Sequence, residues 1–423
     1  MPPLARFLRS TELDTRMLGM VGVLLAIWIA FHVLSGGLFL TPRNLWNLSV
    51  QSSSVAIMAT GMVLVIVTRN IDLSIGSMLG FNGMVMGVIQ TDLLPKLLGF
   101  EHPATWMLTL AAGLVLGVVL GALQGCIIAY LGIPAFIVTL GGLLVWRGAA
   151  WWVTSGQTVA PLDDRFTLLG GGPEGSIGAT WSWVFGLIAC AAVILSLAHS
   201  RARRRKFDFP LRPMRAEVFL SAAGCVLILA AVAVANAYPW PIGSVGRYAE
   251  ASHIAIPDGG LFIAHGIAIP VLIAIGAGVV MTFLARRTRF GRYVYAIGGN
   301  PEAAELAGVN TRWVIVKVFM LMGLLAAIAG AISIARLNAA TNSEGTLAEL
   351  LVIAAAVIGG TSLAGGIGSV AGAMLGAVLM QSLQSGMVLL GVDTPLQNIV
   401  VGIVLVGAVG IDTIYRRRTG SAS

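Results

Sequence analysis

The sequence predicts an all-α, polytopic helical membrane protein, and three observations lead to this prediction. Of the 423 residues, 57% are hydrophobic and only 10% are charged, whereas soluble proteins carry about 25% charged residues. The mean hydropathy is +0.91. About 12 apolar segments follow one another along the chain, and a bilayer core needs about 20 apolar residues per helix. An ordinary cytosolic enzyme and a disordered chain are therefore excluded.

The apolar segments extend over most of the sequence. We expect spans at about 17–35, 50–68, 73–90, 106–130, 135–153, 179–199, 216–238, 261–284, 313–335, 347–364, 369–390 and 396–415. Glycine or proline flanks both 135–153 and 347–364. Whether these two segments cross fully or are re-entrant stays open at this point.

The distribution of basic residues predicts the orientation. The net charge is +8, from 26 basic and 18 acidic side chains. With a cytoplasmic N-terminus and alternating spans, about 20 of the 26 basic residues fall on the cytoplasmic side, as the positive-inside rule requires. The excess of basic residues therefore reports orientation, and we expect no nucleic-acid partner. This places a cytoplasmic segment at 1–16, a transmembrane domain at 17–415 and a cytoplasmic tail at 416–423.

Glycines and a short internal similarity indicate how the helices pack. Residues 117–122 (GVVLGA) are similar to 372–377 (GAMLGA), and in the expected topology these two stretches run in opposite directions. We therefore expect an inverted repeat, an arrangement that is common in transporters. Glycine stripes with a spacing of four permit close helix approach. They comprise Gly113, Gly117, Gly121 and Gly125, and then Gly368, Gly372 and Gly376.

The basic loop 286–312 contains the clearest local signal for a short helix. Asn300 suits the N-cap, Pro301 suits the first helical position, and Gly308 suits a left-handed cap. A helix of about two turns is unstable alone in water, so it needs a partner surface. The residues that define it are Asn300, Pro301, Glu302, Ala303, Ala304, Glu305 and Gly308.

This loop and three further motifs resemble a known family. Glu302-Ala303-Ala304 followed by Gly308 resembles the EAA-x-x-x-G loop of ABC importer permeases, whose short helix docks on the ATPase. The other motifs are NIDLSIGSMLG at 70–80, PAFIVTLGG at 134–142 and VIGGTSLAGGIGS at 357–369. Together with YAIGGNPEAAELAGVNT at 295–311, they are similar to the ribose/xylose/arabinose branch of sugar ABC permeases, over about 45–415.

The resemblance implies an architecture, a cargo and a set of partners. The segment 179–238 adds two spans and a basic loop, 201–215, to a ten-span permease core, and such an extra pair is similar to permeases for D-xylose. Xylose is therefore the expected cargo, while ribose, arabinose, galactose or a nucleoside remain alternatives. The implied partners are a second copy of the permease, an ATP-binding subunit, a periplasmic sugar-binding protein, the monosaccharide and membrane lipid, in the bacterial inner membrane.

The chain lacks the motifs of a nucleotide-hydrolysing enzyme. A P-loop requires a lysine within a glycine-rich loop, and Lys96, Lys206 and Lys317 follow Pro95, Arg205 and Val316. We therefore expect no catalytic residue, no metal site and no cofactor in this chain, with ATP bound by the partner subunit. A secondary transporter driven by protons or Na⁺ is the second hypothesis. It is disfavoured because Asp72 and Glu349 lie near predicted span ends.

Polar side chains inside apolar spans are functional candidates by default. Uncharged amides and hydroxyl groups suit the transient passage of a sugar, although hydrogen bonds between helices are the alternative. For Arg147 the alternative is that it extends toward the outer interface beside Trp146, Trp151 and Trp152. Arg69 and Asp72 flank the polar break between the second and third spans, where a local ion pair is expected and a coupling site is the alternative. The translocation-path candidates are Asn82, Gln124, Arg147, Gln381, Gln384 and Ser385.

Overall fold

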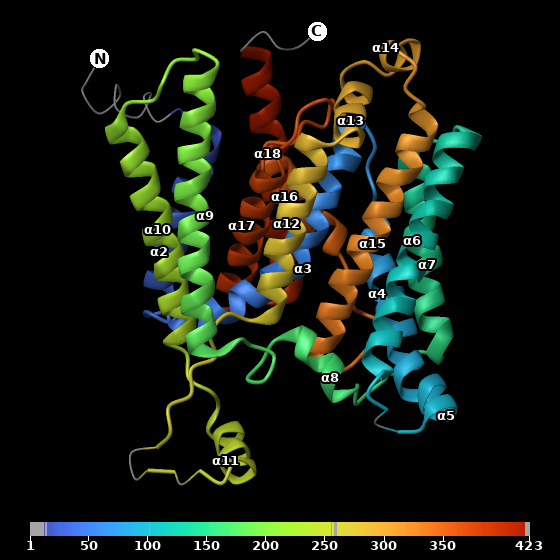
Figure 1. Cartoon of the computed structure of the whole chain (residues 1–423). Helices are drawn as coiled ribbons and strands as arrows, with labels where there is room; N and C mark the ends of the chain where they lie inside the picture. The colour runs from blue at the N-terminus through green and yellow to red at the C-terminus, as the bar shows by residue number, and fades with distance from the viewer. Residues whose placement is uncertain (1–11, 13–14, 101, 255, 258–259, 419–423) are drawn as a thin grey trace.

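The protein is a bundle of long antiparallel helices (Figure 1). The computed structural model describes the backbone of residues 12, 15–100, 102–254, 256–257 and 260–418, with their side chains except 15, 408 and 411–418. The helices are α2 (Thr15–Leu34), α3 (Pro42–Val67), α4 (Ile75–Val88), α5 (Leu94–Leu98), α6 (Thr105–Leu131), α7 (Ala135–Thr154), α8 (Asp164–Thr167), α9 (Gly178–Lys206), α10 (Met214–Asn236), α11 (Ile242–Ala251), α12 (Ile269–Arg287), α13 (Arg289–Gly299), α14 (Pro301–Leu306), α15 (Thr311–Leu337), α16 (Ala348–Ile358), α17 (Val370–Leu389) and α18 (Thr394–Arg418).

The helical membrane architecture predicted from composition is confirmed. Within the described ranges, nine helices are long and apolar enough to cross a membrane. Each apolar segment expected from the sequence lies in a helix, and the uncertain segment 135–153 forms α7, which has 20 residues. The segment 261–284 is shorter than expected, because its helix α12 begins only at Ile269. The predicted terminal segments 1–16 and 416–423 lie mostly outside the described residues.

One of the expected spans is too short to cross. Helix α16 has 11 residues, so it is about 17 Å long at 1.5 Å per residue. A bilayer core of about 30 Å exceeds this length, and segment 347–364 is therefore not a full span. Helix α4 has 14 residues, but it continues without a break through a π-helical turn (Ile89–Leu93) into α5, so segment 73–90 forms the start of a longer helical stretch. Helix α18 is apolar only over Thr394–Gly407 and is likewise not one of the nine.

The arrangement of the two halves matches the predicted inverted repeat. Each half has a buried long helix (α3 or α15), then a short helix (α4 or α16), then a glycine-rich helix (α6 or α17). The halves exchange partners, because α6 packs along α15 and α17 packs along α3. Helices α3 and α15 run in opposite directions in Figure 1. The core of the molecule therefore lies at α3 and α15, which are buried along most of their lengths.

One face of the bundle carries the basic segments. The connection between α9 and α10, the helices α13 and α14, and the end of α18 lie at the same end of the molecule (Figure 1). We call this end the basic face. Helices α5, α8 and α11 lie at the opposite end. The predicted topology grouped these basic segments on one side, and the structure agrees.

The glycine stripes permit backbone contact between helices. A Cβ atom at Gly117 would collide with the carbonyl oxygen of Gly323, and one at Gly121 would collide with that of Phe319. The second stripe packs similarly against α16, where Gly376 faces the carbonyl group of Ala355. Since helices in lipid gain little from the hydrophobic effect, this close packing is the source of much of their association.

Replacing Gly117 by alanine is expected to destabilise the bundle by about 1–3 kcal/mol, because the added methyl group forces α6 away from α15. Thermal unfolding of the purified protein in detergent measures the effect. Gly22→Ala in α2 is the control, since no atom lies within 4 Å of a Cβ at Gly22 and alanine favours helix. Equal melting temperatures for the two variants would contradict the proposed packing role.

Candidate functional site

The short helix α14 projects from the basic face (Figure 1). The side chain of Asn300 accepts a hydrogen bond from the amide of Ala303 at 3.0 Å and so forms the predicted N-cap. Gly308 has φ = +82° and ends the turn in the left-handed region that favours glycine. Ala304 is buried against the bundle, whereas Leu306 is 91% exposed. The predicted helix is thus present, and it presents an unpartnered apolar side chain to solvent.

A second helix precedes α14 and was not predicted. Helix α13 spans Arg289–Gly299, and the side chain of Thr288 caps it by accepting from the amide of Gly291 at 3.1 Å. Val294 and Ile297 are buried on one face of this helix. A threonine N-cap followed by apolar residues three apart was the signal available in the sequence.

Arg69 attaches α13 to the end of α3. Its Nε atom donates to the carbonyl oxygen of Gly298, and its Nη2 atom donates to that of Gly299, each at 2.8 Å. The expected ion pair with Asp72 is therefore wrong. Arg69 instead supplies donors to carbonyl groups at the C-terminal end of α13, which have no partner within that helix.

The connection between α16 and α17 is joined to the same region. The amide of Gly366 donates to the carbonyl oxygen of Val67 at 3.0 Å. The Tyr295 hydroxyl group on α13 donates to the carbonyl oxygen of Gly368 at 2.9 Å. A displacement of α13 and α14 would therefore act directly on the end of α3 and on the segment that follows α16.

The N-terminal ends of α4 and α16 meet inside the bundle. A Cβ atom on Gly76 would collide with the carbonyl group of Gly345 and the carboxylate of Glu349. A helix N-terminus has unsatisfied amides and a partial positive charge, so it favours nearby carboxylates. Asp72 precedes α4, and its Oδ1 atom accepts from the Ser74 amide at 2.8 Å and from the Ser74 hydroxyl group at 2.6 Å.

Both carboxylates lie at helix ends, as expected, because Asp72 precedes α4 and Glu349 lies in the first turn of α16. They are nevertheless buried, since Asp72 is 1% exposed and Glu349 is 6% exposed. The sequence did not reveal this burial, because it depends on the meeting of the two N-terminal ends inside the bundle. Sequence reasoning therefore missed Asp72, Ser74 and Glu349 as members of a buried polar cluster.

Three of the predicted path residues lie around this cluster, on α4, α6 and α7. The Oε1 atom of Gln124 accepts from the Ser74 hydroxyl group at 3.0 Å. Asn82 donates to the carbonyl group of Met78 at 2.9 Å. The Gln124 Nε2 and Asn82 Oδ1 atoms are buried without a hydrogen-bond partner. Such groups are costly in a dry interior, so these two amides are polar groups near α4 whose hydrogen-bonding capacity the described residues do not satisfy.

Arg147 points toward the connection between α15 and α16. Its Nη1 atom donates to the carbonyl oxygens of Asn342 at 3.0 Å and Glu344 at 2.9 Å. Trp151 and Trp152 on the same helix are exposed. Arg147 is therefore held to the chain around the polar cluster rather than extended to the interface beside these tryptophans.

The other three predicted path residues lie on α17, away from this cluster. Gln381 donates to Gln51 on α3 at 3.2 Å, and Ser385 donates to Asn44 on α3 at 3.4 Å. Gln384 is partly buried. These contacts join α17 to α3, which is the alternative that the sequence left open for such residues. Among the described residues no hydrogen bond joins the two sets, so the six predicted residues do not form one site.

Replacing Arg147 by glutamine is expected to lower transport at least tenfold while the protein still inserts and folds. The shorter neutral side chain cannot reach both carbonyl groups, and hydrogen bonds to a charged group contribute about 1.5–3 kcal/mol. Uptake into proteoliposomes measures the effect. Arg336→Gln, at an exposed position at the end of α15, is the matched control. Normal uptake by the Arg147 variant would exclude a role for this anchor.

The fold and these two regions define a class of protein, a multi-pass membrane permease. Comparison with known proteins supports this assignment. Residues 44–205 and 209–409 match the family model described as branched-chain amino acid transport system / permease component. The chain therefore belongs to this family of transport permeases, and it is a transport component rather than an enzyme.

Individual relatives are similar over nearly the whole chain. The xylose transport system permease protein XylH of Escherichia coli (strain K12) is 37% identical over 408 residues, covering 96% of this chain and 94% of the relative. XylH of Haemophilus influenzae is 37% identical, and the similarity covers 97% of this chain and 99% of that relative. The ribose import permease protein RbsC of Escherichia coli (strain K12) is 33% identical, and the similarity covers 88% of this chain and 87% of that relative. No solved structure gives a significant match.

Proposed function

We propose that this chain is the membrane subunit of an ATP-driven importer that moves a monosaccharide, D-xylose, across a bacterial inner membrane. The observation that supports the cargo is the similarity to xylose transport permeases over 96% of the chain, which includes the inserted helices α9 and α10. The ribose permease matches a smaller share, 88%, at a lower identity. The basic face is then cytoplasmic, together with both chain termini.

In this proposal, ATP is bound and hydrolysed by a separate subunit that docks on α14. The exposed Leu306 and the capped geometry of α14 support this docking site. Two copies of the permease form the pore, and a periplasmic sugar-binding protein delivers the sugar to the far side. Closure of the ATP-binding subunits moves α14 and α13, and the Arg69 bonds transmit this movement to α3.

The buried carboxylates of Asp72 and Glu349 favour a second candidate, an ion-coupled transporter. The decisive experiment measures labelled xylose accumulation in vesicles that contain the permease with its ATP-binding and sugar-binding subunits. The proposal predicts accumulation that requires ATP and is insensitive to an ionophore. ATP-dependent uptake of ribose, arabinose, galactose or a nucleoside in place of xylose would replace the proposed cargo but keep the ATP-driven mechanism. Accumulation that ignores ATP and collapses with an ionophore would reject the ATP-driven mechanism.

A further inference from the structure

Helices α9 and α10 stand apart from the rest of the bundle. They pack mainly on each other, and α10 makes only a small contact with α3 (Figure 1). An apolar cavity of about 600 Å³ lies between this pair and the core, lined by residues of α2, α3, α10, α12 and α17. Its walls include Leu227 and Val234 from α10 and Val271 and Ile275 from α12.

A second pocket, of about 400 Å³, lies at the basic end of the same pair of helices. Its polar lining comes from the last turns of α9, with Arg287 from the end of α12. We call it the headgroup pocket, defined by Ser196, His199, Ser200, Arg203, Arg204 and Arg287. Phe207 and Phe209 complete the lining and are 60% and 63% exposed.

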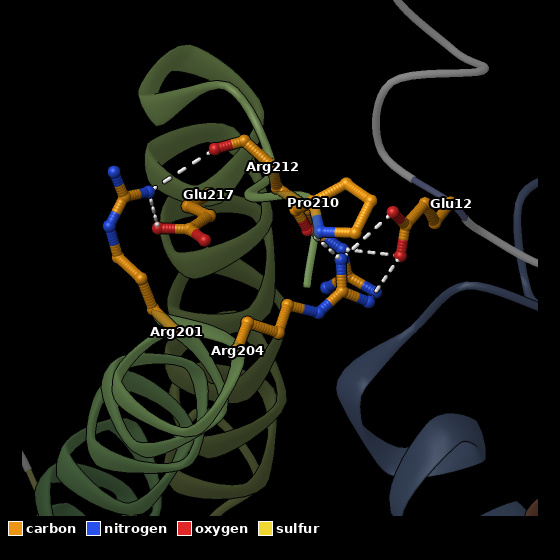
Figure 2. A network of polar contacts seen from close by, with 6 residues as sticks. All are labelled: Glu12, Arg201, Arg204, Pro210, Arg212 and Glu217. Carbon is orange, nitrogen blue, oxygen red and sulfur yellow. Dashed lines mark hydrogen bonds and ion pairs between the residues drawn. The ribbon is translucent and has the colours of Figure 1, made fainter. Parts of the chain in front are cut away.

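Two acidic side chains, Glu12 and Glu217, neutralise Arg201, Arg204 and Arg212 in this region (Figure 2). Arg204 pairs with Glu12 at 2.6 Å, and Arg212 pairs with the same carboxylate at 3.0 Å. Arg201 pairs with Glu217 at 2.7 Å. The hydrogen bond from Arg204, aided by Arg212, lowers the pKa of Glu12 to about 2. Glu12 is therefore charged at neutral pH.

Two guanidinium groups of the headgroup pocket, those of Arg203 and Arg287, form no ion pair within the part of the chain that the structure describes. They come from two different helices and line one pocket together with the Ser196 and Ser200 side chains. Two arginines and hydroxyl donors around one concave site match the oxygen atoms of a phosphate group.

We infer that the headgroup pocket binds the phosphate of an anionic phospholipid. The position of the pocket points to a lipid, because it lies at the ends of the membrane-spanning helices α9 and α12, and the exposed side chains of Phe207 and Phe209 in its lining offer apolar surface to an acyl chain. The apolar cavity lies deeper, because Ile275, its lining residue nearest to the pocket on α12, is 12 residues before Arg287, about 18 Å along the helix, and one leaflet of the hydrocarbon core is about 15 Å thick. A lipid held by Arg203 of α9 and Arg287 of α12 would join the inserted pair to the core where protein contacts are few.

Native mass spectrometry and thermal unfolding of the detergent-purified chain test this inference. The probes are phosphatidylglycerol, phosphatidylcholine with the same acyl chains, and inorganic phosphate. We expect selective binding and stabilisation by phosphatidylglycerol. We expect the double variant R203Q/R287Q to bind it about 30-fold more weakly, because each arginine near an anionic lipid contributes about a fivefold effect. The double variant must retain its monodisperse elution and its melting temperature without lipid.

The matched control is R205Q/K206Q, which removes the same amount of charge at the end of α9 but outside the pocket. This control is expected to bind phosphatidylglycerol like the unmodified protein. Equal weakening by both double variants would mean a diffuse surface effect and would overturn the inference. Equal binding of both phospholipids, or stabilisation by inorganic phosphate alone, would also overturn it. If R203Q/R287Q does not fold, single variants R203Q and R287Q are measured, each with an expected fivefold effect. This site does not depend on the cargo or on ATP, so its failure leaves the proposed function intact.

Discussion

Replacing Leu306 by serine is expected to weaken binding of the ATP-binding subunit about 30-fold. Leu306 is 91% exposed at the tip of α14, and burying a leucine side chain at an interface stabilises it by about 2 kcal/mol. The helix itself should remain, because its caps at Asn300 and Gly308 are unchanged. Co-purification of the two subunits and ATP-dependent uptake measure the effect.

Ile242 provides the control for this experiment. It is also 91% exposed, but it lies in α11 at the opposite end of the molecule (Figure 1). Ile242→Ser should therefore leave the ATP-binding subunit attached. If Leu306→Ser retains normal affinity, α14 is not the docking helix.

Replacing Arg69 by alanine is expected to uncouple ATP hydrolysis from transport while leaving the ATP-binding subunit attached. The substitution removes both hydrogen bonds from the end of α3 to the carbonyl groups at the end of α13. Hydrogen bonds to a charged group contribute about 1.5–3 kcal/mol each, so the amount of sugar moved per ATP hydrolysed should fall at least tenfold. Arg69→Lys should recover only part of this coupling, because an ammonium group lacks the planar, forked donor geometry of a guanidinium group.

The control for Arg69 is Arg312→Ala, which removes the same charge near the same face. Arg312 lies one residue into α15 and is exposed. Its loss should leave the amount of sugar moved per ATP hydrolysed within about twofold of the value for the unmodified protein, because surface charges usually contribute little. Equal losses for both variants would assign the effect to charge rather than to the Arg69 bonds.

Much of the fold could be predicted because it depends on local patterns. Apolar length indicated the long membrane helices, and the spacing of Gly117 and Gly121 indicated close packing that the structure confirms. The shortness of α16 could not be predicted in the same way. The segment 347–364 is as apolar as a full span, and only the close approach of Gly345, just before α16, to Gly76 in α4 indicates where α16 begins.

The predicted site residues show the same difference between features set by nearby residues and features set by contacts between distant parts of the chain. Asn300 and Gly308 were predictable because caps act within a few residues. The partners of Arg69 were not, since Gly298 and Gly299 are more than 200 positions away along the chain. Backbone carbonyl groups are present at every residue, so no pattern of residue types marks them as partners. The separation of Gln124 from Gln381 also depended on helix packing that the sequence does not specify.

Photo-crosslinking from α14 tests most directly whether this helix docks on the ATP-binding subunit. A benzophenone amino acid at position 306, and separately at position 242, is introduced into the full chain assembled with its ATP-binding subunit. The proposed docking predicts a crosslink to the ATP-binding subunit from position 306, with a yield that changes when ATP is bound, and no crosslink from position 242. A crosslink from position 242 alone would contradict the proposal, and so would the absence of any crosslink from both positions in an assembly that still imports sugar.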